Sequence, residues 1–264
     1  MKPHEAWGII VRCGAYLSGG HYKLVGGDHT DEYVHLRIVL LDKAYRDAFA
    51  RSILEKFNDT KITAIASFSK AGNLLAEAVR DTLVSSGVFV KLLTGRRRRI
   101  DSSQDLIIEG LENLKQDDNV LVVSTVVTTG SSIQDAIHSI ERNSPATVVG
   151  AGVILERRPG LSIGGRSGVV RLRSIVTRQM SLWKTGECPL DDIYGDPEDL
   201  GDPDENPIPL IRSVAKTSTL NLNHLIVAEA SNARHNRRRQ LILASIGWLL
   251  SIVRLIIDFL LRIK

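Results

Sequence analysis

Apolar runs and amphipathic stretches alternate along most of the chain. Runs dominated by apolar residues, of the kind that fill strands buried in a sheet, occur at 61–68, 88–93, 105–110, 120–123, 146–155 and 168–176. Apolar residues at helical spacing occur at 1–18, 42–58, 74–83 and 133–140. Strands that alternate with helices predict an α/β fold, in which a parallel sheet is covered by helices on both faces. Ligands of such folds bind at the carboxyl ends of the strands.

The stretch 119–140, NVLVVSTVVTTGSSIQDAIHSI, is the most informative of these units. An apolar strand leads into a loop of small and hydroxyl-bearing residues, and helical spacing resumes at Ile133. The first backbone N–H groups of a helix are unpaired and carry the positive end of the helix dipole, so such a loop suits a phosphate group. No Lys follows Gly130, which disfavours a nucleoside-triphosphate loop.

The sequence VLVVSTVVTTGSS resembles the ribose-phosphate loop of the type I phosphoribosyltransferases, and among them the orotate phosphoribosyltransferase branch most closely. In that family a hydrophobic strand is followed by two acidic residues, two apolar residues and T-T-G-x-S. The resemblance implies a type I phosphoribosyltransferase fold with a small hood. It also implies that the 5′-phosphate of a phosphoribosyl ligand binds to Val127, Thr128, Thr129, Gly130, Ser131 and Ser132. Ser124 and Thr125 stand in place of the acidic pair and would face the ribose.

The resemblance covers about residues 15–190 and implies roles for three further segments. Residues 21–37 resemble the segment that helps form the hood over the base, and 156–160 resemble a strand end near the base. Ser69, Lys70, Ala71 and Gly72 match a loop whose amides face pyrophosphate. The hood and base residues would include Tyr33, Arg37, Glu156 and Arg157. Cys188-Pro189-Leu190 resembles a C-P-L-C sequence near the end of some members, with Asp191 at the position of the second Cys.

A cluster of basic residues follows the third predicted strand. Members of the orotate branch place basic residues at the end of this strand and on a mobile loop that closes over the diphosphate, often in the neighbouring subunit of a homodimer. The resemblance implies this role for Lys91, Arg96, Arg97, Arg98 and Arg99, and guanidinium groups pair bidentately with phosphate. The family's R-K-E-x-K pattern is not reproduced. Contact with nucleic acid and a solvated surface loop therefore remain alternatives.

The replacement of the acidic pair bears on activity. Phosphoribosyl transfer passes through a ribosyl cation-like state, which the family's carboxylates stabilise. Losing one preorganised electrostatic contact typically costs ~10²–10³ in rate, and Ser124 and Thr125 carry no charge. We therefore expect a retained phosphoribosyl pocket, with Mg²⁺ if the diphosphate is bound, and lost or altered transfer. Glu109 and Glu156 are alternative sources of a carboxylate.

Charge and composition divide the chain into three parts. At 264 residues it can hold one α/β domain, expected at 1–185, plus an extension. Residues 186–211 contain nine acidic side chains and no Lys or Arg, and 212–264 carry a net charge of +7. Two cysteines and an N-terminus without signal-peptide order favour the cytoplasm. The spacing of His21, His29 and His35 suits neither one helix face nor a hairpin site, so we expect no metal site there.

The segment 240–264 predicts a helix that is apolar except for one narrow stripe. The apolar surface of such a helix has to be buried. It can lie in a membrane, with Arg237–Arg239 on the headgroups of the inner face. Alternatively, it can pack against a partner protein, in an oligomer or on its own domain. Three functions follow. The first is a binding protein that acts as a sensor or effector through this helix, as in antiviral defence. The second is an active phosphoribosyltransferase or nucleotide-consuming enzyme, and the third is a nucleic-acid-associated subunit. The residues at 124 and 125 favour the first.

Overall fold

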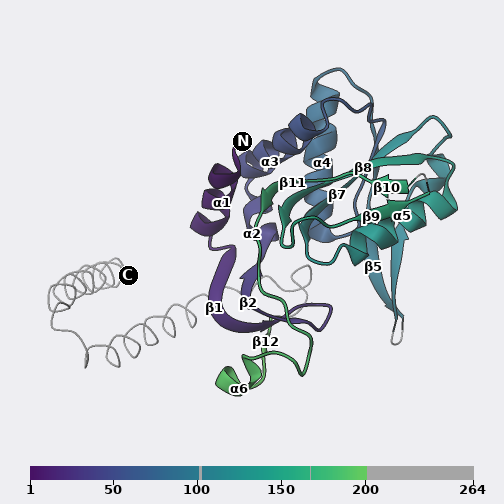
Figure 1. Cartoon of the computed structure of the whole chain (residues 1–264). Helices are drawn as coiled ribbons and strands as arrows, with labels where there is room; N and C mark the ends of the chain where they lie inside the picture. The colour runs from purple at the N-terminus through teal and green to yellow at the C-terminus, as the bar shows by residue number, and fades with distance from the viewer. Residues whose placement is uncertain (101–102, 167, 201–264) are drawn as a thin grey trace, which may run out of the picture. The chain divides into compact units, whose positions relative to one another are not determined.

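The computed structural model describes residues 1–100, 103–166 and 168–200, with the backbone alone at 97–100 and 103–105 (Figure 1). Its centre is a five-stranded sheet in the order β11-β8-β7-β3-β4, in which every pair of neighbours is parallel. The strands are β3 (Ala64–Ala66), β4 (Lys91–Leu93), β7 (Asn119–Val127), β8 (Thr147–Glu156) and β11 (Leu172–Thr177). This sheet confirms the predicted α/β class.

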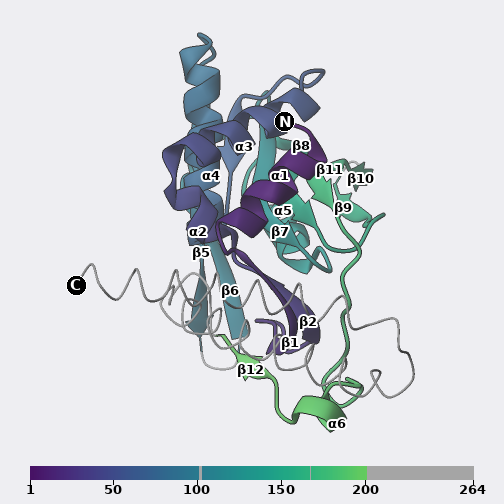
Figure 2. The same ribbon diagram turned by 90° about the vertical axis from the view of Figure 1, so that its left-hand side faces the viewer.

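Helices cover both faces of the sheet (Figures 1 and 2). One face packs against α1 (Pro3–Arg12), α2 (Leu36–Leu41), α3 (Lys43–Lys56) and α4 (Lys70–Ser85), and the other packs against α5 (Ser131–Asn143). Successive residues of a strand point to opposite faces. Accordingly, Leu121 and Val123 of β7 join the first core and Val120 and Val122 join the second, which explains the uninterrupted apolar run in the sequence.

Smaller sheets flank the centre. β1 (Tyr16–Lys23) and β2 (His29–Val34) form an antiparallel hairpin, called the hood below, and β12 (Glu198–Asp199) pairs in parallel with β1. β5 (Gly95–Ile100) pairs with β6 (Ser103–Ile108), and β9 (Ile163–Gly165) pairs with β10 (Gly168–Val170). A 3₁₀ turn, η1 (Leu111–Asn113), precedes β7, and α6 (Asp191–Tyr194) lies between β11 and β12.

Three expectations need correction. The predicted helix at 1–18 ends at Arg12, because the chain turns at Gly14 (φ +66°) and enters β1. Residues 95–100 are not an open loop, since their backbone pairs with β6. The strand predicted at 105–110 is part of β6 and therefore lies outside the central sheet.

The predicted helix at 240–264 lies outside the described residues, as do the tail's arginines. Among the residues that the structure describes, no helix has both the length and the apolar character needed to cross a membrane.

Two glycines of β8 allow α3 to pack closely on the sheet. A Cβ on Gly150 would lie 2.4 Å from Cε1 of Phe57 and 3.2 Å from the carbonyl oxygen of Arg171, and Phe57 is 2% exposed. A Cβ on Gly152 would lie 2.7 Å from Cγ2 of Ile53. The tight contact between α3 and β8 therefore depends on the absence of side chains at these positions.

Gly150→Ala is expected to lower the free energy of unfolding by about 1–3 kcal/mol, since overpacking forces side chains and backbone to shift. Urea unfolding followed by circular dichroism measures it. Gly164→Ala is the matched control, because its Cβ would make only an ordinary contact of 3.6 Å with Gln134, and we expect a change within about 0.5 kcal/mol. Equal losses in the two variants would contradict the packing explanation.

Candidate functional site

A cavity of about 440 Å³ lies at the carboxyl edge of the central sheet. This volume is in the range of small-molecule sites. Three parts of the chain line it: the hood with the start of α2, the turn from β3 into α4, and the end of β7 with the turn into α5. Arg96 and Arg157 complete the lining. The predicted loops therefore meet in one cavity.

The turn from β7 into α5 forms one wall. Val127, Thr128, Thr129, Gly130, Ser131 and Ser132 all line the cavity. Gly130 has φ +86°, a conformation that residues with a side chain rarely adopt, and α5 begins at the next residue without a side-chain cap among the described residues. The Oγ1 atom of Thr129 lies 3.1 Å from Oγ of Ser131. The first amides of α5 and these hydroxyls are thus gathered where an anion fits best.

The two positions predicted to face a ribose lie beside this wall. Ser124 and Thr125 are within β7 and line the cavity, and Ser124 is 6% exposed. Among the described residues that line the cavity, Asp28 is the only carboxylate, and its Oδ1 accepts a hydrogen bond from Nζ of Lys184 at 2.8 Å. The two residues predicted to face the ribose are therefore polar and uncharged, and no described carboxylate of the lining is free of an ion pair.

Neither alternative carboxylate replaces the pair. Glu156 is 9% exposed, and its Oε2 accepts hydrogen bonds from Oγ of Ser174 at 3.1 Å and from Oγ1 of Thr177 at 3.4 Å. It faces β11 rather than the cavity, which corrects its predicted place near the base. Glu109 follows β6 and does not line the cavity either.

The turn into α4 provides a second wall. Ser69, Lys70 and Ala71 line the cavity, and Oγ of Ser69 caps the helix by accepting a hydrogen bond from the backbone N–H of Gly72 at 3.0 Å. Gly72 itself is packed behind the wall, since a Cβ there would lie 2.3 Å from Oγ of Ser67. This glycine allows the helix start to approach β3.

Cations outnumber anions in the lining. Lys70 and Arg96 lie on the side of α4 and β5, and Arg37 and Arg157 lie on the side of the hood. The side chains of Arg97, Arg98 and Arg99 lie outside those described. Four cationic residues with one carboxylate make the cavity suited to an anionic ligand.

Lys91 does not belong to this group, which corrects the sequence prediction. It is the first residue of β4 and lies at the amino edge of the sheet, where its Nζ contacts Oδ2 of Asp118 at 2.5 Å and the carbonyl oxygen of Asn113 at 3.0 Å. Burial alone would raise the pKa of Asp118, but hydrogen bonds from Lys91, the backbone of Lys115 and Thr63 hold it below its usual value. Lys91 is a structural cation.

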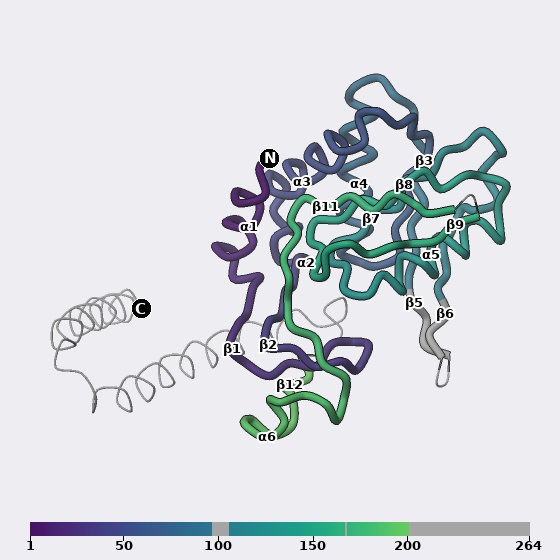
Figure 3. The backbone as a smooth tube through the Cα atoms, viewed as in Figure 1, coloured from purple at the N-terminus to yellow at the C-terminus, as the bar shows by residue number. Residues whose placement is uncertain are grey.

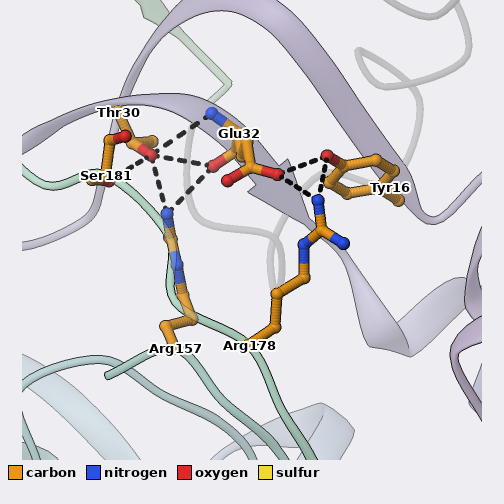
Figure 4. Close-up of polar contacts among 6 residues, drawn as sticks. All are labelled: Tyr16, Thr30, Glu32, Arg157, Arg178 and Ser181. Atoms are coloured by element: carbon orange, nitrogen blue, oxygen red, sulfur yellow. Dashed lines mark hydrogen bonds and ion pairs between the residues drawn. The ribbon is translucent and has the colours of Figure 1, made fainter. Parts of the chain in front are cut away.

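The hood is joined to the sheet through Arg157, as Figure 4 shows. Its Nη2 donates to Oγ1 of Thr30 at 2.7 Å and to the carbonyl oxygen of Glu32 at 3.0 Å. Arg157 is 3% exposed, and burial lowers its pKa. Its Nε is buried without a hydrogen-bond partner among the described residues. Arg157 thus holds the hood and also faces the cavity.

A second arginine supports the same hairpin. The carboxylate of Glu32 accepts hydrogen bonds from the Tyr16 hydroxyl and, at 3.1 Å, from Nη2 of Arg178 (Figure 4). Burial and the hydrogen bond to Glu32 raise the pKa of Tyr16. The guanidinium of Arg178 lies 4.6 Å from the ring centroid of Trp7. The sequence did not reveal this network, because its members lie far apart along the chain.

The three histidines fall into two separate places. His21 and His29 meet Cys188 and Asp191 below the hood, whereas His35 lines the cavity. The predicted hood residues Tyr33 and Arg37 line the cavity as well.

Comparisons with known proteins agree with this geometry. No family model matches the chain. The chain is 30% identical over 174 residues to the orotate phosphoribosyltransferase of Caldanaerobacter subterraneus subsp. tengcongensis, and the match covers 66% of this chain and 84% of that protein. It is 26% identical over 189 residues to the orotate phosphoribosyltransferase of Pelotomaculum thermopropionicum, covering 72% of this chain and 92% of that protein.

A solved structure is similar as well. The orotate phosphoribosyltransferase from Aeropyrum pernix is 26% identical and aligns with a TM-score of 0.50, covering 64% of this chain and 92% of the other. The chain therefore belongs to the orotate phosphoribosyltransferase family and has the type I phosphoribosyltransferase fold.

Proposed function

We propose that this protein binds a 5-phosphoribosyl compound, phosphoribosyl diphosphate or a nucleotide, and transfers its phosphoribosyl group slowly or not at all. The lining of the cavity supports the proposal: it contains the turn predicted to bind phosphate and four cationic residues, but Ser124 and Thr125 at the positions predicted to face the ribose. Its relatives are named for orotate, which makes orotate the first base to test.

The lining favours one orientation of the proposed ligand in the cavity. Its 5′-phosphate would accept hydrogen bonds from the amides at the start of α5 and from the hydroxyls of Thr128 and Ser132. A diphosphate on the other side of the ribose would reach the start of α4, near Lys70 and Arg96. The hood would cover the base.

The described lining does not fit a protein-held Mg²⁺. This ion prefers oxygen ligands and is commonly held by one or two carboxylates together with substrate phosphates. Asp28 is the only lining carboxylate described, and it is paired with Lys184. Any Mg²⁺ would therefore enter on the diphosphate of the ligand.

Reduced transfer follows from electrostatics. As pyrophosphate leaves, positive charge grows on the ribose ring. Ser124 and Thr125 can accept hydrogen bonds from ribose hydroxyls, but they cannot neutralise that charge. The cationic lining favours the bound anion and opposes a cation-like state, so binding would be retained better than turnover.

Isothermal titration with ribose 5-phosphate and with phosphoribosyl diphosphate tests the binding. The two compounds are expected to compete for one site. Thr128→Val is expected to weaken the binding of both by about 10–100-fold, because a hydrogen bond to a charged group contributes about 1.5–3 kcal/mol. Thr147→Val is the matched control, since Thr147 is exposed at the opposite edge of the sheet. If neither compound binds, or if the two variants behave alike, the proposal is wrong.

The sensor or effector role, the oligomeric state, and the membrane, partner-protein and nucleic-acid contacts stay predictions. Those that depend on residues 201–264 concern a segment outside the described residues.

A further inference from the structure

Four side chains of the kinds that bind metal ions converge between the hood and the segment after β11. His21 comes from β1 and His29 from β2, whereas Cys188 and Asp191 come from the segment that runs from β11 past the hood to β12 (Figure 3). One ligand atom from each residue lies within 4.8 Å of all the others. None of the four lines the large cavity, so the cluster is separate from the phosphoribosyl site.

The distances suit ligands around one ion. Nε2 of His21 lies 3.1 Å from Nδ1 of His29, 3.3 Å from Oδ1 of Asp191 and 3.5 Å from Sγ of Cys188. Nδ1 of His29 lies 3.1 Å from the same Oδ1. Tetrahedral zinc with bonds of about 2.0–2.3 Å separates its ligand atoms by roughly 3.3–3.6 Å. Small shifts of the side chains would bring all four atoms to that separation.

Hydrogen bonding alone explains this arrangement poorly. Nδ1 of His21 lies 2.9 Å from the carbonyl oxygen of Gly195, and a carbonyl can only accept, so Nδ1 carries the proton in this contact. Nε2 has a single in-plane direction for a hydrogen bond, as an acceptor or as a donor, yet three polar atoms lie within 3.5 Å of it. A metal ion uses the lone pair in that one direction and accounts for the approach of the other three atoms.

The hydrogen bond to Gly195 is also typical of a metal-binding histidine. Such histidines commonly donate their second ring N–H to a carbonyl or carboxylate, which holds the ring in place. His21, His29 and Cys188 are 6%, 4% and 5% exposed, and the Asp191 side chain is 35% exposed. Three of the four side chains that would bind the ion are thus shielded from solvent, and the ion could enter beside Asp191.

The ligand types select among metals. One thiolate, two imidazoles and one carboxylate suit Zn²⁺, whereas Mg²⁺ and Ca²⁺ prefer oxygen atoms alone. Four protein ligands leave no position for a substrate, which is the pattern of a structural zinc site.

We propose that His21, His29, Cys188 and Asp191 form a structural zinc site. The ion joins the segment after β11 to the hood. That segment also contacts the hairpin through backbone pairs, such as His29 with Trp183. Side chains add further links, among them the ion pair of Lys184 with Asp28 and the hydrogen bond from Oγ1 of Thr30 to the carbonyl oxygen of Ser181. Because the hood also lines the cavity, zinc stabilises the part of the fold that covers the phosphoribosyl ligand.

The zinc content of tag-free protein, measured by mass spectrometry after gel filtration, tests the proposal. We expect one zinc per chain, loss of zinc in Cys188→Ser, and full retention in Cys13→Ser. Cys13 is the chain's other cysteine and lies in the cap of α1, away from the cluster. Retention of zinc by Cys188→Ser, or its loss from both variants, would overturn the assignment.

Cobalt spectroscopy keeps the proposal testable if Cys188→Ser does not fold. Chelator-treated wild-type protein titrated with Co²⁺ is expected to show tetrahedral d–d bands and one thiolate charge-transfer band, and its unfolding temperature should rise as zinc is returned. Asp191→Cys should keep one ion per chain and add a second thiolate to the charge-transfer band. A wild-type protein that binds neither ion at one equivalent, or binds Co²⁺ without a thiolate band, refutes the site.

Discussion

Replacing both Ser124 and Thr125 with Asp is expected to raise the rate of pyrophosphate release from phosphoribosyl diphosphate and orotate by ~10² or more. Each restored electrostatic contact is expected to contribute ~10²–10³, reduced here by imperfect placement of new side chains. Affinity for the diphosphate should change much less, because the turn proposed to bind phosphate, 127–132, is untouched. The measurement is single-turnover release of pyrophosphate with Mg²⁺ present.

The cavity can accommodate the new charges. Ser124 is 6% exposed, so an isolated carboxylate there would be costly, but Lys70, Arg96, Arg37 and Arg157 line the same cavity. Asp is preferred to Glu because its side chain adds the fewest atoms to β7. Thermal unfolding of the variant shows whether the fold tolerates it.

The control is the double replacement of Ser124 and Thr125 with Asn, which has the shape of Asp without its charge. We expect this variant to release pyrophosphate no faster than the wild type. Equal rates in the Asp and Asn variants would show that charge at these positions does not limit transfer. A wild-type rate already equal to that of an active relative assayed in parallel would refute slow transfer directly.

The parts of the site that the sequence predicted are those encoded locally. The turn at 127–132 follows a strand buried on both faces, and its glycine and hydroxyls adjoin a helix with clear apolar spacing. Since the strands are parallel, their carboxyl ends meet at one edge, and the turn after β3 joins the same cavity. The first inference needs only neighbouring residues, and the second needs only the parallel direction of the strands.

The misplaced residues depend on contacts that no local pattern contains. Lys91 lies within an apolar run, but pairing of β4 with β3 begins only at Lys91. It therefore lies at the amino end of β4, whereas the ligand cavity lies at the carboxyl ends of the strands. Glu156 follows an apolar strand like many site residues, but Ser174 and Thr177 of β11 hold its carboxylate away from the cavity.

The cluster of His21, His29, Cys188 and Asp191 illustrates the same limit at longer range. His21 and Cys188 are 167 positions apart. The histidine spacing alone suits no site. Contacts between the hairpin and the distant segment after β11, such as the pairing of β1 with β12 and of His29 with Trp183, bring Cys188 and Asp191 to the two histidines, and no local pattern in the sequence contains these contacts.

Arg157→Met is expected to weaken both the hood and the binding of anionic ligands. The variant loses the hydrogen bonds to Thr30 and to the carbonyl of Glu32, each worth about 1.5–3 kcal/mol because the donor is charged. Part of this loss is offset, since Met no longer buries a guanidinium whose Nε has no partner among the described residues. The net expectation is a fall of about 1–3 kcal/mol in the free energy of unfolding, measured in urea.

Ligand binding should weaken by a comparable free energy. Arg157 is one of four cationic residues in the lining, and the hood it holds also contributes Tyr33. We expect the dissociation constant of phosphoribosyl diphosphate to rise by about 10–100-fold, since losing a charged hydrogen-bonding partner costs about 1.5–3 kcal/mol. Isothermal titration measures this change.

Arg158→Met is the matched control, because Arg158 is the next residue, carries the same charge and is exposed. It should leave both the unfolding free energy and the affinity close to their wild-type values. A double-mutant cycle with Thr30→Val then isolates the contact at 2.7 Å, and coupling of about 0.5–3 kcal/mol is expected for residues in direct contact. If the two arginine variants are indistinguishable, Arg157 does not hold the hood. Zero coupling with Thr30 would instead mean that Arg157 affects ligand binding directly from the cavity, without acting through the hairpin.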